Sequence, residues 1–154
     1  MLTMFAYGTL KRGERNHERY CSGALRVEEG AVRGELYDLP IFGYPELIVP
    51  EDSVRAFGTD DHAGDAELQE RLVLRRAPAL DGPRVFGDIL FFDDPESRLP
   101  AIDRLEGFDS AVASSHYRRV LLPVEPDEGG ALLAWAYVVR EPSGTYLPDG
   151  WWPP

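Results

Sequence analysis

Short runs of apolar, β-branched and aromatic residues recur along the chain, and Gly, Pro and Asp residues separate them. Such runs are typical of β-strands, because strands are short and turn residues end them. We expect strands at residues 2–7, 31–39, 72–74, 85–92, 117–124 and 132–139. Helical patterns are sparse by comparison. The chain is therefore predicted to fold as an α+β domain that is mostly β.

The clearest helical pattern covers residues 100–106. Leu99, Ile102 and Leu105 recur every three residues and would share one face of a helix. Pro100 suits the first turn of such a helix, and Gly107 is placed to end it. Residues 16–21 are predicted to form one or two further helical turns.

Length, cysteine content and charge exclude several classes of protein. A chain of 154 residues fits one domain, residues 1–154, whose core needs no covalent support. The single cysteine, Cys21, excludes an intramolecular disulfide framework and agrees with a reducing compartment, so we expect a cytoplasmic protein. No apolar run reaches the roughly 18 residues of a membrane span, and the first residues lack the pattern of a secretion signal. A net charge of −11 argues against nucleic acid and anionic membranes as partners.

The acidic residues are concentrated in one segment. Residues 51–70 hold seven acids and one base, Arg55, together with Gly58 and Gly64. This composition indicates an exposed acidic loop, inserted into the single domain at about residues 51–70. Two interpretations are open: a solvated loop without a further role, or a flap that attracts a cationic substrate.

The first predicted strand ends in Tyr7-Gly8-Thr9-Leu10, and a basic turn that contains Gly13 follows at once. Gly8 has no Cβ, so the backbone can come close to another group where the strand breaks. Exposed peptide N–H groups at such a break can bind carboxylates and developing oxyanions. The pattern predicts either an anion cradle of this kind or an ordinary strand with a tight turn.

Glu106 lies in the last turn of the predicted helix, next to Gly107. A carboxylate there faces the negative end of the helix dipole, and the flanking Leu105 and Phe108 favour partial burial. Both effects disfavour the charged form and raise the pKa, which suits a general acid/base near neutral pH. The alternative is an exposed glutamate at a helix end that has no chemical role.

The segments FAYGTLKRG (5–13) and LPAIDRLEGFD (99–109), followed by YRRVLLPV (117–124), resemble the γ-glutamylcyclotransferase-like family, specifically its γ-glutamylamine cyclotransferase or AIG2-like branch. The segments VRGELYDL, GYPEL, VFGDILFFDD, AWAYVV and PDGWW also fall in the family's order. The resemblance covers most of the chain apart from about residues 51–82. It implies a small, mixed, partly closed barrel with short flanking helices.

The resemblance also implies a reaction. In the family, the α-amine of a γ-glutamyl amine or peptide attacks its own side-chain amide carbonyl, which releases 5-oxoproline and a free amine. Glu106 takes the place of the family's catalytic acid/base, and no cofactor or metal is required. The residues that would bind the γ-glutamyl group are Tyr7, Gly8, Thr9, Leu10 and Tyr117. The identity of the released amine stays open. The alternative is a non-catalytic small-molecule-binding or interaction module, because a fold does not determine function.

The remaining candidates are weaker. His17, His62 and His116 lie far apart in the sequence without the spacing of a metal site, and Cys21 is expected to be a small buried residue. Arg118 and Arg119 are expected to point to opposite faces of a strand, with one of them in an ion pair.

The aromatic residues near the end of the chain, Tyr146, Trp151 and Trp152, allow three interpretations. They cover the mouth of the cavity, cap the core or form a subunit contact. The sequence leaves the oligomeric state open.

Overall fold

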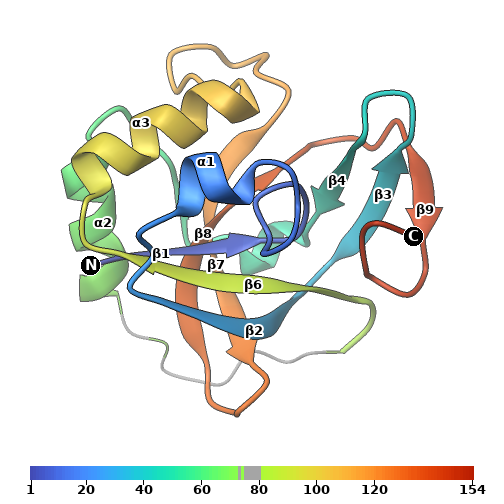
Figure 1. Cartoon of the computed structure of the whole chain (residues 1–154), viewed down its shortest axis with the longest axis horizontal. Coiled ribbons are helices and arrows are strands. Elements are labelled where there is room, and N and C mark those ends of the chain that lie inside the picture. Colours follow the sequence, from blue (N-terminus) through green and yellow to red (C-terminus); the bar gives the residue numbers. More distant parts are fainter. Residues whose placement is uncertain (73, 75–80) are drawn as a thin grey trace.

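Five strands close into a barrel in the computed structural model, which describes residues 1–72, 74 and 81–154 (Figure 1). They follow the order β2-β6-β1-β8-β7, and β7 pairs in turn with β2, which completes the circle. These strands are β1 (Leu2–Ala6), β2 (Arg26–Arg33), β6 (Arg84–Phe92), β7 (Arg118–Pro126) and β8 (Leu132–Val138). The short β5 (Ala56–Phe57) pairs with β7 beside the point of closure.

A smaller sheet and the helices flank the barrel on different sides (Figure 1). The smaller sheet has the order β4-β3-β9, formed by β3 (Glu35–Leu39), β4 (Tyr44–Ile48) and β9 (Thr145–Leu147). The helices are α1 (His17–Cys21), α2 (His62–Arg71), α3 (Pro95–Glu106) and the 3₁₀ helix η1 (Glu51–Ser53). None of the helices in the described residues has the length and apolar character that crossing a membrane requires.

The two faces of the barrel strands pack into two separate cores. In β1, Leu2 and Met4 contact the helices through a core that includes Leu99 and Ile102 of α3. Phe5, on the opposite face of β1, belongs to the second core, which receives side chains from all five barrel strands and fills the barrel. Because both faces are covered, β1 and β8 are apolar nearly throughout instead of alternating with polar residues.

The expected α+β, mostly β, partly closed barrel with short flanking helices is confirmed, and β1, β6, β7 and β8 lie where strands were predicted. The predicted strand at residues 31–39 is instead divided between β2 and β3. The two strands are separated by Gly34, whose backbone lies so close to β4 that an added Cβ would be 2.5 Å from the carbonyl oxygen of Ile48. Only a glycine fits at this close approach, and the chain bends there. Of the strand expected at residues 72–74, residues 72 and 74 lie outside any strand and residue 73 lies outside the described residues.

The helix predicted at residues 100–106 begins five residues earlier than expected. Pro95 occupies the first turn of α3, whereas Pro100 lies inside the helix, where it cannot donate a hydrogen bond to the carbonyl of Glu96. Gly107 ends the helix at φ 69°, as predicted.

The acidic loop expected at residues 51–70 is wrong, because this segment contains η1, β5 and most of α2. The Asp61 side chain accepts a hydrogen bond from the N–H of Gly64 and so caps the start of α2. Asp65 is only 4% exposed, since its charge is paired with Arg119 of the barrel. Asp65 is therefore a buried structural group. The other six acids of the segment are exposed, as expected, but they lie on or beside folded elements instead of in a loop.

Candidate active site

One cavity brings together all six residues that the sequence singled out as site residues. It lies where the loop after β1, the first residues of β4 and the carboxyl end of α3 meet. The predicted residues on its wall are Tyr7, Gly8, Thr9, Leu10, Glu106 and Tyr117. The structure adds others that the sequence analysis did not identify: Phe5, Ala6, Tyr44, Pro45 and Tyr137.

The cavity is small, about 30 Å³, which is enough for one or two water molecules. Glu106 and Tyr44 are its partly exposed members, and the other lining residues are buried. The mouth of the cavity therefore lies between Glu106 and Tyr44. A larger ligand can be accommodated only when a side chain at this mouth moves aside.

The loop after β1 presents unpaired N–H groups at the cavity. Within the described part of the chain, the N–H groups of Gly8, Thr9 and Leu10 have no hydrogen-bond acceptor. Their carbonyl groups are all engaged: Gly8 accepts from Lys11 N, Thr9 from Asn16 N, and Leu10 contacts His17 Nδ1 at 2.8 Å. Buried N–H groups are rarely left unpaired, so three in succession are a candidate binding site for an anionic or carbonyl oxygen.

Contacts behind the loop hold it in place. Asp88 of β6 accepts hydrogen bonds from the Arg12 N–H at 2.7 Å and from Arg12 Nη2 at 3.0 Å. The buried Lys11 donates to the carbonyl of Trp152 and lies 3.4 Å from the centre of the Trp151 ring, and burial lowers its pKa. Neither tryptophan lines the cavity, and Trp152 packs into the barrel core. Of the expected roles for the aromatic tail, capping the core is the one that Trp152 performs.

Gly8→Ala is expected to lower both stability and ligand affinity. A Cβ at Gly8 would lie 2.8 Å from Cδ and Cγ of Pro45, a rigid ring in β4 that cannot turn away. The loop and β4 would have to separate, which moves the unpaired N–H groups relative to Glu106. Thermal unfolding and ligand titration of the variant test this, with Gly13→Ala as a comparison, because a Cβ at Gly13 meets no atom within 4 Å although its φ of 83° strains any other residue. An unchanged affinity in Gly8→Ala would contradict the role given to this close approach.

Glu106 is the titratable group of the cavity whose pKa is shifted into the neutral range. Burial raises the pKa of its carboxyl to about 7, and the negative charge of Asp103, one helical turn away, acts in the same direction. At neutral pH the carboxyl is thus close to half protonated and can both accept and donate a proton. The expected rise in pKa is confirmed, with burial as its main cause.

A buried network lies behind Glu106 and fixes the end of α3. Asp103 accepts hydrogen bonds from Arg119 Nε at 2.9 Å and Tyr137 Oη at 2.5 Å, and His62 Nε2 lies 3.0 Å from its other oxygen. Arg119, which is fully buried, also donates to Asp65 at 2.9 Å. The network joins α2, α3 and two barrel strands, so the position of Glu106 depends on groups from four elements.

Two tyrosines of the cavity wall, Tyr7 and Tyr117, are fixed hydrogen-bond donors. Tyr7 Oη donates to the carbonyl of Tyr137 at 2.6 Å, and Tyr117 Oη donates to the carbonyl of Pro45 at 2.6 Å. Burial raises the pKa of both phenols above the ordinary value, so they stay protonated at neutral pH. Their side chains shape the wall of the cavity.

The remaining candidates from the sequence are structural. Among the described residues, no group of three or more His, Cys, Asp or Glu side chains could hold a metal ion. His116 pairs with the buried Glu46 at 3.2 Å, and burial raises the pKa of the Cys21 thiol to about 12. An ion pair was expected for one of the two adjacent arginines, and both form one: Arg118 with Glu51, and Arg119 with Asp65 and Asp103.

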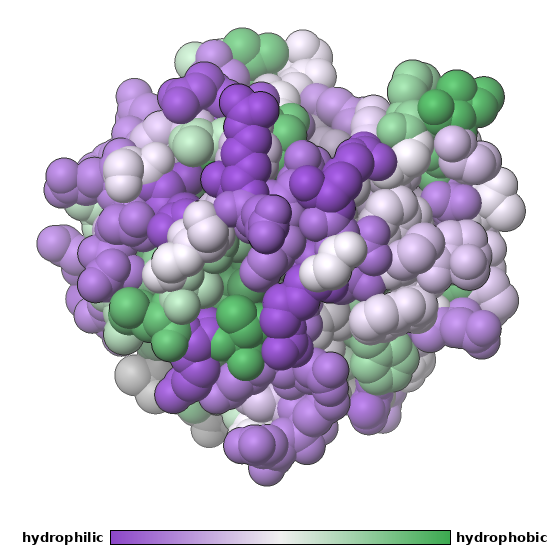
Figure 2. All heavy atoms as spheres, viewed as in Figure 1, coloured by the Kyte–Doolittle hydropathy of each residue, from purple (hydrophilic) through white to green (hydrophobic). Residues whose placement is uncertain are grey.

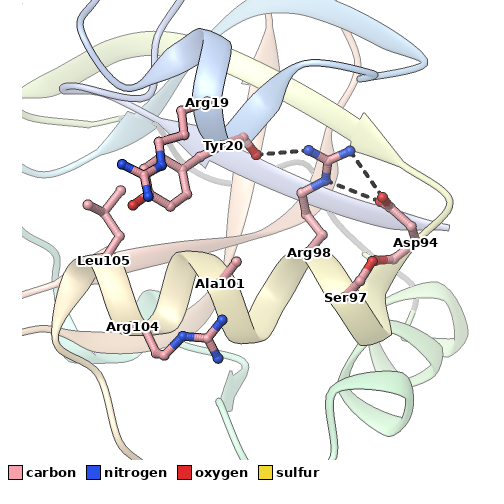
Figure 3. Close-up of a pocket in the computed structure, with 8 residues that line it drawn as sticks. All are labelled: Arg19, Tyr20, Asp94, Ser97, Arg98, Ala101, Arg104 and Leu105. Atoms are coloured by element: carbon pink, nitrogen blue, oxygen red, sulfur yellow. Dashed lines mark hydrogen bonds and ion pairs between the residues drawn. The ribbon is translucent and has the colours of Figure 1, made fainter.

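A second hollow of about 530 Å³ lies between α1 and α3 (Figure 3). Its most buried charge, Arg98, is paired within the hollow, with Asp94 at 3.0 Å and the carbonyl of Tyr20 at 2.9 Å. The guanidinium of Arg19 lies against the Tyr20 ring. None of the predicted site residues lines this hollow, so the small cavity is the candidate active site.

Comparison with known proteins agrees with this assignment of the fold. A family model described as gamma-glutamyl cyclotransferase, AIG2-like, matches residues 4–72 and 58–154. The chain is similar in structure to an AIG2-like protein from Mus musculus, with 23% identity, a TM-score of 0.57, and coverage of 97% of this chain and 81% of the mouse chain.

One archaeal and one bacterial structure share the same fold. An uncharacterized protein from Pyrococcus horikoshii has 16% identity and a TM-score of 0.58, with coverage of 98% of this chain and 89% of that chain. YkqA from Bacillus subtilis has 20% identity and a TM-score of 0.60, with coverage of 98% of this chain and 39% of the longer YkqA chain. No curated protein matches the chain significantly.

Proposed function

The chain belongs to the gamma-glutamyl cyclotransferase, AIG2-like family, and on this premise we propose that it releases 5-oxoproline from a γ-glutamyl amine or peptide. One observation supports the proposal above all others. A carboxyl with a pKa of about 7, that of Glu106, shares a single cavity with the unpaired N–H groups of Gly8, Thr9 and Leu10. Cyclisation of a γ-glutamyl group needs a proton carrier and an oxyanion site at the same place.

The reaction begins with the α-ammonium group of the substrate, whose reference pKa is about 8. Glu106, as the carboxylate, removes a proton, and the free amine attacks the side-chain amide carbon. A carbon–nitrogen bond forms while the carbonyl electron pair moves onto oxygen. The N–H groups of the Gly8–Leu10 loop stabilise this oxyanion, and the loss of one such donor typically costs about 3–4 kcal/mol of barrier.

The intermediate then collapses. The carbonyl re-forms, the bond to the departing nitrogen breaks, and Glu106 returns its proton to that nitrogen. Glu106 then takes the second proton that the attacking nitrogen still carries and passes it to the released amine, which leaves as an ammonium ion. Of the three protons on the original ammonium group, one stays on the ring nitrogen of 5-oxoproline and two leave with the released amine. Because nucleophile and electrophile belong to one molecule, the protein needs only to fold the substrate into a reactive geometry. No step calls for a metal or a cofactor.

The alternative function is a non-catalytic binding module with the same fold. A module of that kind could use the loop N–H groups to hold a carboxylate, but it has no use for Glu106. A carboxyl whose pKa is raised to about 7 destabilises the folded protein at neutral pH. Such a costly group at the mouth of a cavity favours catalysis.

The direct test is release of 5-oxoproline from γ-glutamylethylamide, which contains little beyond the γ-glutamyl unit. The matched control is the same amide with an acetyl group on the α-amine, because this blocks the nucleophile and leaves the scissile amide intact. We expect turnover of the first compound and none of the second. Binding of γ-glutamylethylamide without turnover would favour the binding module.

The pH dependence of kcat/KM is expected to be bell-shaped. The rate should rise through pH about 7 as Glu106 loses its proton, because the carboxylate is the form that accepts the substrate's proton. It should fall above pH about 8, where the free substrate amine is no longer protonated. A substrate with a less basic α-amine should move only the upper limb. A lower limb near the ordinary carboxyl pKa would contradict the role of Glu106.

A further inference from the structure

Three aromatic rings run from the surface into the cavity. The ring centres of Phe42 and Tyr44 are 5.7 Å apart, and those of Tyr44 and Tyr117 are 6.3 Å apart. Exposure falls along this row, from 61% for Phe42, through a partly exposed Tyr44, to 5% for Tyr117. We call Phe42, Tyr44 and Tyr117 the aromatic row. It begins at the tip of the β3–β4 hairpin and ends on the cavity wall.

The outer end of the aromatic row lies on an apolar tip. Ile41 is 92% exposed beside Phe42, and Figure 2 shows apolar side chains gathered at the tip of the β3–β4 hairpin, at the upper right. Hydrogen bonds from the N–H groups of Phe42 and Gly43 to the carbonyl of Leu39 hold the turn, so Phe42 is presented on a defined backbone. Of these two exposed side chains, Phe42 is the one whose ring lies next to Tyr44 at the mouth of the cavity, so we expect Phe42 to contact a ligand.

The charges of the residues that line the cavity favour an uncharged group on the ligand. Among the described residues that line the cavity, Glu106 is the only charged one, and it is assigned to proton transfer. The wall therefore offers no cation for an acidic group on the departing amine and no free carboxylate for a basic one. An uncharged aromatic group can instead stack on Tyr44 and Phe42.

We infer that the amine released by this protein carries an aromatic or large apolar group, which lies on the aromatic row while the γ-glutamyl unit occupies the cavity. The inference rests on the proposed function, because it concerns the leaving group of that reaction. Movement of Tyr44 away from the mouth would open the cavity and place its ring beside the departing amine. Phe42 and Tyr44 are then the residues that determine specificity.

One nearby charge defines the competing outcome. Arg15, which is exposed, donates from Nη1 to the carbonyl of Gly43 at 2.6 Å, so a guanidinium group lies at the base of the hairpin tip. Its remaining N–H groups could hold a carboxylate on the leaving group. γ-Glutamylphenylalanine and γ-glutamylphenethylamide differ only in that carboxylate and therefore separate the two recognition modes.

The experiment compares kcat/KM for four compounds: γ-glutamylethylamide, γ-glutamylphenethylamide, γ-glutamylphenylalanine and ε-(γ-glutamyl)lysine. We expect the phenethylamide to exceed the ethylamide by about tenfold or more, as one buried aromatic contact allows. Phe42→Ala should lower this ratio severalfold. Ile41→Ala, a truncation at the neighbouring position outside the aromatic row, should leave the ratio unchanged.

Three results would overturn the inference. The first is a phenethylamide-to-ethylamide ratio of kcat/KM near one in the wild type, and the second is a ratio that Phe42→Ala leaves intact. The third is a preference above tenfold for γ-glutamylphenylalanine or ε-(γ-glutamyl)lysine over the phenethylamide. Failure of the proposed function is distinguishable, since it would appear as absence of turnover for all four compounds. Calorimetric dissociation constants for the ethylamide and the phenethylamide would still decide the inference in that case. The aromatic row predicts the tighter binding for the phenethylamide with or without turnover.

Discussion

Glu106→Gln is expected to lower the turnover of γ-glutamylethylamide by about a hundredfold to ten-thousandfold, the usual contribution of a general acid/base. Glutamine keeps the size of the side chain and its hydrogen-bonding capacity, but it can neither remove the ammonium proton nor return it to the departing nitrogen. The measurement is kcat with saturating substrate at pH about 7, the pKa of Glu106.

The matched control is Glu96→Gln, the same change on an exposed residue in the first turn of the same helix. It should keep wild-type turnover. Equal turnover in wild type and Glu106→Gln would show that another group carries the protons.

Unfolding does not account for the expected loss in Glu106→Gln. The folded-state pKa of Glu106 is raised to about 7 from an ordinary value of 4.5, so the folded protein holds the proton more tightly than the unfolded chain does. Stability from this group is therefore present at acid pH and is lost as the pH rises through about 7. Above that pH the neutral glutamine should be at least as stable as the wild type.

Arg119→Met is expected to cost about 3–5 kcal/mol of folding free energy, because it leaves buried carboxylates without their cation. Arg119 is fully buried and donates to both Asp65 and Asp103, which are 4% and 7% exposed. Methionine approximates the length of the side chain, so loss of the charge dominates the effect. Urea unfolding measures the difference.

The control for Arg119→Met is Arg118→Met, at the next position of β7. The partner of Arg118, Glu51, is largely exposed, and an exposed ion pair contributes about 1 kcal/mol or less. A loss in Arg119→Met no greater than that in Arg118→Met would mean that the buried network does not hold the helices to the barrel.

Local sequence patterns predicted those strands and helix ends that a short segment of the chain is enough to determine. The strands of the barrel read as apolar runs, and the end of α3 follows from Gly107, whose φ of 69° suits glycine. β4 was missed because Pro45 and Glu46 interrupt its apolar pattern. Glu46 is nonetheless fully buried, since it accepts hydrogen bonds from the N–H groups of Ser143 and Gly144 far along the chain. A pairing over that distance leaves no local signal.

The residues of the candidate site also fall into two groups, those that the sequence predicted and those that it did not. Glu106 and the Tyr7–Leu10 loop were predicted as site residues from two short segments and from the family resemblance. Tyr44, Pro45 and Tyr137 line the same cavity, but only the packing of β4 and β8 against the loop brings them there. The charge of Asp65 was read as a solvated acid because its partner, Arg119, lies 54 positions away. Neighbouring acids gave no indication of that pairing.

Intramolecular cyclisation is tested most directly by the product formed from γ-glutamylethylamide in ¹⁸O-labelled water. Intramolecular attack by the α-amine uses no water, so we expect 5-oxoproline without the label and one equivalent of ethylamine. Mass spectrometry of the acidic product distinguishes this from hydrolysis. Glutamate that carries the label in its side-chain carboxyl would contradict cyclisation and would mean that the Glu106 cavity activates water instead.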